Sequence, residues 1–250
     1  MGAWFSNGGE NALAAADIAG NQLVSLTGGN DATVGIFNLA ASGASDTVAG
    51  TLWTYSNGTQ AAPLAITAGT ATIADASNFR VTLSIPGLAK PPVAYFTGFS
   101  SRASGLPGAF PTTAFLVGTD ALADSGEIVW QSPTATNFGD STLKYLGAYS
   151  SLGVFPVGCM PAASSGCLWS STGWILFDGN GGYTVTVSLS TNGKGAFGPP
   201  LKVGLQATGN YAVNGDGSGN FGGSPMVTNG VRSYATVGGG LPGVDVMTKQ

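Results

Sequence analysis

Residues 173–189, GWILFDGNGGYTVTVSL, carry the clearest structural signal in the chain. An apolar run leads into a Gly/Asn-rich segment at residues 178–182, and every second residue from Tyr183 to Leu189 is then apolar. Alternation of period two places these side chains on one face of a strand. Gly and Asn tolerate the positive φ angles of tight hairpin turns. The stretch therefore predicts a β-hairpin with one buried face.

Strand signals of the same kind run through the rest of the chain. Residues 51–73 predict a second hairpin with its turn at Asn57-Gly58, and residues 79–85 alternate until Pro86, which has no backbone N–H to donate. Helical periodicity is confined to short segments. Further strands are expected at residues 23–26, 33–39, 93–99, 113–117, 127–131, 202–207 and 233–237, and short helical segments at residues 10–18, 119–124 and 140–146.

Many short strands separated by turn signals predict an all-β fold, an antiparallel β-sandwich or jelly-roll-like domain. The sequence does not alternate strands with long helices, which argues against an α/β architecture. We expect one domain over residues 21–250. Extended Gly-rich arms are expected at both ends, at residues 1–20 and at about residues 214–250.

The composition is poor in charge and rich in glycine. Only 8% of the 250 residues are charged, against roughly 25% in an ordinary soluble domain, while 43% are hydrophobic and 41 are glycine. The apolar content is enough for a folded core, unlike that of a disordered chain. Either Ser, Thr, Asn and Gly solvate the surface, or neighbouring subunits cover much of it; we favour the second interpretation.

The two Gly-rich ends contain isolated large apolar residues. Trp4 and Phe5 stand in the N-terminal segment, while Phe221 and Leu241 stand in the C-terminal one. Single large side chains on flexible segments are suited to insertion into a pocket on a neighbouring subunit. We therefore predict that these four residues are assembly anchors, the alternative being frayed termini.

The chain contains no histidine and only two glutamates, Glu10 and Glu127. This excludes Ser-His and Cys-His nucleophile arrangements and the common His-bearing metal sites. A glycosidase using Asp120, Asp124 or Glu127 is the remaining enzymatic alternative. A solvated turn before a strand explains those three residues better, so we expect no enzymatic activity and no cofactor.

A weak calcium pattern occurs in the glycine-rich C-terminal segment. Asn214, Asp216, Ser218 and Asn220 place a side-chain oxygen at every other position, as calcium loops do. The segment contains one carboxylate and lacks the bidentate glutamate of an EF-hand. A flexible turn is therefore the favoured interpretation, with no metal site.

The two cysteines, Cys159 and Cys167, lie close together in the sequence. A disulfide between them would close a short loop and suit a protein used outside a reducing compartment. Two buried free thiols are an equally good interpretation. Without histidine, two sulfurs do not make a structural zinc site.

The charge pattern also excludes some partners. Five lysines and three arginines are scattered along the chain and the net charge is −4, which argues against nucleic-acid binding. The longest apolar runs are too short for a membrane-spanning helix. Trp169, beside the two cysteines, is the aromatic residue that we expect to contact a ligand, if one binds.

These features favour a non-enzymatic structural component of a larger assembly. A phage or viral capsid, decoration or tail protein fits best, made in the host cytoplasm without an export signal and held in the virion by contacts with copies of itself and other virion proteins. The alternative is a β-sandwich module that binds a surface glycan or receptor, tail-associated or extracellular.

Overall fold

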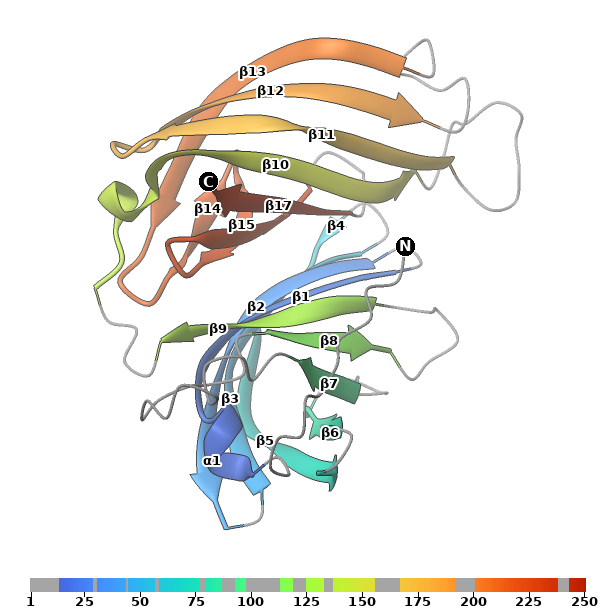
Figure 1. Ribbon diagram of the computed structural model, residues 1–250, viewed down its shortest axis with the longest axis vertical. Helices are drawn as coiled ribbons and strands as arrows, with labels where there is room; N and C mark the ends of the chain where they lie inside the picture. The colour runs from blue at the N-terminus through green and yellow to red at the C-terminus, as the bar shows by residue number, and fades with distance from the viewer. Residues whose placement is uncertain are drawn as a thin grey trace. The chain divides into compact units, whose positions relative to one another are not determined.

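The computed structural model describes residues 14–28, 31–43, 45–56, 59–76, 80–86, 93–97, 113–118, 125–132, 137–155, 167–191, 201–237 and 243–250. Most of them lie in antiparallel strands, so the prediction of an all-β fold is confirmed (Figure 1). The chain divides into two compact units, where the sequence led us to expect one domain over residues 21–250. The first unit comprises residues 1–26, 36–51 and 64–134, and the second comprises residues 27–35, 52–63 and 135–250.

Nine strands form the first sheet, in the order β2-β1-β9-β8-β7-β6-β5-β3-β4. An additional pairing of β2 with β3 joins strands from its two ends, and the sheet curves into a half-barrel. Helix α1 (Ala15–Ile18) precedes the sheet, whose strands are β1 (Gly20–Gly28), β2 (Asp31–Ser42), β3 (Ser45–Ser56), β4 (Thr59–Gln60), β5 (Leu64–Asp75), β6 (Arg80–Ser84), β7 (Val93–Thr97), β8 (Thr113–Val117) and β9 (Ser125–Ser132).

Alternation in the sequence explains the core of this half-barrel. In β6 the apolar residues Val81 and Leu83 are buried, while Arg80, Thr82 and Ser84 are exposed. The strand ends two residues before Pro86, as predicted. Apolar side chains at every second position thus build the interior of the sheet.

The second sheet is a closed barrel of eight strands that follow one another in chain order, from β10 to β17. Such a meander differs from a jelly roll, which needs Greek-key connections. The jelly-roll prediction is therefore corrected for this sheet. A short 3₁₀-helix (Asp140–Leu143) precedes β10 (Lys144–Phe155), β11 (Cys167–Asp178), β12 (Gly182–Thr191), β13 (Leu201–Val213), β14 (Ser218–Phe221), β15 (Ser224–Thr228), β16 (Arg232–Thr236) and β17 (Gly243–Lys249).

Aromatic rings fill the core of the barrel. The ring centroid of Phe177 lies 5.2 Å from that of Tyr145, 4.9 Å from that of Tyr211 and 6.1 Å from that of Phe221. The Phe221 ring also stacks on Tyr183 at 4.1 Å. Phe221 is thus buried inside its own barrel, whereas the sequence led us to expect an anchor on an extended arm.

The C-terminal segment is folded into the barrel instead of forming an extended arm. Strands β14 to β17 pair in succession, and β17 pairs back onto β10 to close the ring. Glycines that resemble a linker in the sequence occupy the turn between β14 and β15, where Gly222 has φ +58° and Gly223 has φ +88°. Trp4, Phe5 and Leu241 lie outside the described residues, so their predicted anchoring role stays a prediction.

The predicted hairpin at residues 173–189 is confirmed as β11, β12 and the turn between them. Gly179 and Gly181 in that turn have φ +80° and +92°, as the sequence suggested. The helical segment expected at residues 140–146 is present only as the 3₁₀-helix, because β10 starts at Lys144. Four strands were not anticipated: β10, β14, β15 and β17.

Candidate functional site

The outer face of β10 to β13 is arranged in rows of cross-strand neighbours. One row runs through Leu146, Leu176, Thr184 and Thr208. The next row is offset by two residues on each strand and contains Ala148, Trp174, Thr186 and Gln206. Strand alternation directs these residues away from the aromatic core. The face therefore combines large apolar side chains on β10 and β11 with hydroxyl and amide side chains on β12 and β13.

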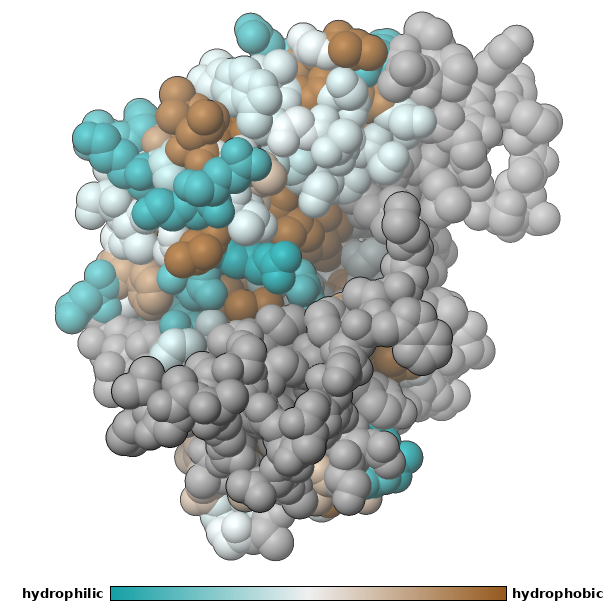
Figure 2. All heavy atoms as spheres, viewed as in Figure 1, coloured by the Kyte–Doolittle hydropathy of each residue, from teal (hydrophilic) through white to brown (hydrophobic). Residues whose placement is uncertain are grey.

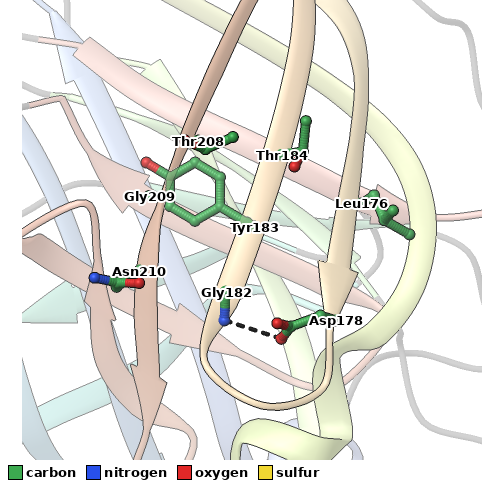
Figure 3. A pocket seen from close by; sticks show the side chains of 8 residues that line it. All are labelled: Leu176, Asp178, Gly182, Tyr183, Thr184, Thr208, Gly209 and Asn210. Carbon is green, nitrogen blue, oxygen red and sulfur yellow. Dashed lines mark hydrogen bonds between the residues drawn. The ribbon is translucent and has the colours of Figure 1, made fainter.

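A pocket of about 480 Å³ opens on this face near the turn between β11 and β12 (Figure 3). Figure 3 shows Asp178 and Asn210 on either side of Gly182, with Thr184 and Thr208 farther along β12 and β13. The lining residues are Leu176, Asp178, Gly182, Tyr183, Thr184, Thr208, Gly209 and Asn210. The pocket is within the range of roughly 300–1,000 Å³ that is typical of small-molecule sites.

Asp178 is the charged residue of this pocket. Its Oδ1 accepts hydrogen bonds from the backbone N–H groups of Asn180, at 2.7 Å, and Gly182, at 2.9 Å. These bonds, led by that from Asn180, hold the pKa of the carboxyl below its usual range, so the group is ionised at neutral pH. Lys144 is the cross-strand neighbour of Asp178 on β10. Lys144 does not line the pocket, so Asp178 is the one charged side chain among its lining residues.

Tyr183 borders the pocket because its partner on β13 has no side chain. Gly209 is the register partner of Tyr183, and a Cβ on Gly209 would lie 2.5 Å from the tyrosine Oη. The ring occupies that space and stacks on Phe221. Gly209 therefore sets the position of the aromatic ring beside the pocket.

Strand β13 has a long open edge. Residues 201–210 pair with β12, but β14 pairs only with Tyr211, Ala212 and Val213. No described strand pairs with residues 201–209 on the side opposite β12. Along this edge Val203 is 73% exposed and Leu205 is 39% exposed. Unpaired backbone groups beside exposed apolar residues are a template for pairing with another strand.

The surface of the barrel unit carries several other apolar residues. Leu146, Trp174 and Leu176 are exposed on neighbouring strands, and Trp174 is 44% exposed. In the view of Figure 2, brown hydrophobic residues lie among pale and teal ones without a continuous polar coat. The described surface of the barrel therefore contains exposed apolar residues, as the low content of charged residues in the sequence suggests.

A polar group lies inside the barrel, beside the aromatic core. Asp245 is buried on β17, and the Tyr149 hydroxyl donates a hydrogen bond of 2.8 Å to its Oδ1. Ser151 is the cross-strand partner of Asp245, and Ser171 is the next partner along that row. Burial raises the pKa of Asp245 to about 6 and raises that of Tyr149. No sequence pattern marks this group, because the strands that carry Asp245 and Tyr149 were not predicted.

The half-barrel holds a second buried carboxyl group. Asp46 on β3 is fully buried, and neither of its oxygens has a hydrogen-bond partner in the part of the chain that the structure describes. Burial raises the pKa of Asp46 to about 6. No sequence pattern marks Asp46, since it stands at an ordinary alternating position of the strand.

The calcium pattern forms a hairpin turn. The Asp216 carboxylate accepts hydrogen bonds from the Ser218 backbone N–H, at 2.9 Å, and from the Ser218 hydroxyl, at 2.6 Å. Asn214 donates a hydrogen bond to the Ser218 Oγ at 3.0 Å, and Asn220 is exposed on β14. The polar atoms are thus used within the turn. Among the described residues, no group of three or more acidic or cysteine side chains is placed to hold a metal ion.

The structure does not show the remaining predicted site residues gathered at one site. Trp169 belongs to β11, two residues before Ser171, and its backbone pairs with Gly153 and Thr191. Cys167 begins the same strand, whereas Cys159 lies outside the described residues, so a disulfide stays a prediction. Asp120 and Asp124 also lie outside the described residues, and Glu127 is half-buried on β9.

No protein-family model matches this chain, and no curated protein is similar to it in sequence. None of the helices in the described ranges has the length and apolar character needed to cross a membrane.

Proposed function

We propose that the protein is a non-enzymatic structural subunit of a larger assembly, a virion protein of the capsid, decoration or tail type. The observation that carries the proposal is the open edge of β13, where exposed Val203 and Leu205 accompany backbone groups that no described strand pairs on one side. A second copy of the same chain is the partner that we expect at this edge.

The chemistry of the edge favours pairing between two copies. Gly204 has φ +70° at a register shift between β12 and β13, so the regular part of the edge begins at Leu205. The segment from Leu205 to Gly209 contains no charged residue. Two such segments can therefore pair in antiparallel fashion about a twofold axis without opposing like charges.

The composition supports assignment to a virion. A soluble monomer normally needs a charged surface, whereas a subunit of an assembly has much of its surface covered by its neighbours. Only 8% of the residues of this chain are charged, which fits the second case. The exposed Leu146, Trp174 and Leu176 are further candidates for such contacts. The absence of histidine from the sequence favours a structural role over common forms of acid–base catalysis.

The proposal is tested by sedimentation velocity over a concentration series. We expect the unmodified protein to form dimers or larger species as concentration rises, because the edge contact obeys mass action. The double variant Val203→Lys/Leu205→Lys should remain monomeric, since lysine on an edge strand opposes strand pairing. Val231→Lys is the matched control, because Val231 is exposed outside β13.

A control variant that assembles like the unmodified protein, beside a monomeric edge variant, supports the proposal. A monomer at every concentration contradicts it. Assembly that persists unchanged in Val203→Lys/Leu205→Lys contradicts the assignment of the contact to β13.

A further inference from the structure

The pocket between Asp178 and Asn210 has features of a ligand site that the assembly proposal does not use. It lies on the outer face of the barrel, whereas strand pairing at the β13 edge uses backbone groups. Its polar side chains come from three strands held in fixed register: Asp178 on β11, Thr184 on β12, and Thr208 and Asn210 on β13. Side chains on regular strands are positioned more firmly than those on loops.

The hydrogen-bonding groups of the pocket suit a ligand with several hydroxyl groups. The Asp178 carboxylate accepts only, while the Asn210 amide and the Thr184 and Thr208 hydroxyls both donate and accept. The backbone bonds to Asp178 use Oδ1, and Oδ2 lies over Gly182, 2.6 Å from where a Cβ would stand there. Neighbouring hydroxyl groups on one molecule can satisfy such a mixed set of donors and acceptors.

The single charge of the pocket disfavours an anionic ligand. Asp178 is the one charged lining residue, and its Oδ1 already accepts two backbone hydrogen bonds. The carboxylate opposes an anion, whereas a neutral molecule can donate hydroxyl hydrogen bonds to it.

An apolar platform adjoins these polar groups. Leu176 lines the pocket, and Trp174, two residues earlier on the same face of β11, is 44% exposed. An exposed indole beside hydrogen-bonding groups suits a molecule with one apolar face and a polar rim.

We propose that this pocket binds a neutral saccharide, with a pyranose ring resting against Leu176 and Trp174 and its hydroxyl groups bonded to Asp178 and Asn210. The ligand-contacting role that the sequence suggested for Trp169 stays a separate prediction. The site does not depend on assembly, so a monomeric edge variant retains it.

The test uses saturation-transfer NMR with four probes: the methyl glycosides of glucose, galactose and mannose, and N-acetylglucosamine. We expect at least one probe to bind at millimolar concentration.

Trp174→Ala and Asn210→Ala should each weaken that binding about fivefold or more. Asp178→Asn should also weaken it, while the retained Oδ1 preserves the hydrogen bonds of the turn. Val231→Ala is the control and should bind as the unmodified protein does.

A substitution on β11 could disturb folding, whereas Asn210→Ala removes only an exposed amide on β13. The Asn210→Ala variant therefore tests binding independently of the β11 variants. Failure of all four probes to bind the folded protein overturns the proposal. Binding that Trp174→Ala and Asn210→Ala both leave unchanged also overturns it. Tetramethylammonium serves as a counter-probe, and its binding in place of the sugars would show a cation site instead.

Discussion

Asp46 and Asp245 are two buried carboxyl groups whose ionisation affects the stability of this fold. Their pKa values are raised to about 6 from an ordinary 3.8, because burial disfavours the charged form. The folded state therefore holds protons that the unfolded state releases between about pH 4 and 6. Stability contributed through these groups is greatest at low pH and decreases as the pH rises through 6.

Substitution of Asp245 tests this relation directly. Asp245→Asn should raise the free energy of unfolding at pH 8 by about 2–3 kcal/mol and change it little at pH 4. The asparagine oxygen still accepts the hydrogen bond from Tyr149, so only the buried charge is removed. Denaturant unfolding at the two pH values measures the effect.

Asp178→Asn is the matched control for that measurement, because Asp178 is exposed and its pKa is lowered. It should give no gain in stability at pH 8. An Asp245→Asn variant that is less stable than the unmodified protein at pH 8 would show that the ionised carboxylate stabilises the barrel.

At the scale of elements, β12 and β13 pack closely where Gly209 leaves room for the Tyr183 ring. Gly209→Ala should lower the free energy of unfolding by about 1–3 kcal/mol, because the new methyl group overlaps the tyrosine ring. The double variant Gly209→Ala/Tyr183→Leu should recover part of this loss. If Gly209→Ala leaves the midpoint of denaturant unfolding unchanged, the ring does not occupy that space.

The strands that the sequence predicted are those with simple alternation. β6 and β12 carry apolar residues at every second position, so the inward-facing side of each strand is visible in the sequence. β10 was missed because Gly147 and Ser151 occupy two of its buried positions and interrupt the apolar period. β14 and β15 were missed because the glycines of the turn between them, with positive φ, resemble a linker in composition.

The candidate site was predictable only in part. The sequence marked Asp178 as a turn residue, and the structure places it in that turn and in the pocket. Cross-strand register brings Asn210 and Thr208 to it from a distant part of the chain, and this register depends on tertiary pairing that local pattern does not specify. The buried position of Asp245 was not predicted either, because it also depends on tertiary strand pairing.

At the scale of the whole molecule, the two sheets differ in how they limit the number of exposed strand edges. The barrel closes through β17 and β10, and the outermost strand of the half-barrel, β4, is only two residues long. Short edges and closure both discourage unwanted pairing. Among the described strands, β13 keeps a long open edge, which is why the assembly proposal depends on it.

Hydrogen exchange at β13, followed by mass spectrometry over a concentration series, tests that claim most directly. Peptides covering residues 203–210 should take up deuterium more slowly as concentration rises, because a second copy pairs with backbone groups that no described strand pairs. Peptides from β16, which is paired on both sides, should be unaffected. Uptake at residues 203–210 that is the same at every concentration, and the same in Val203→Lys/Leu205→Lys, would contradict the account.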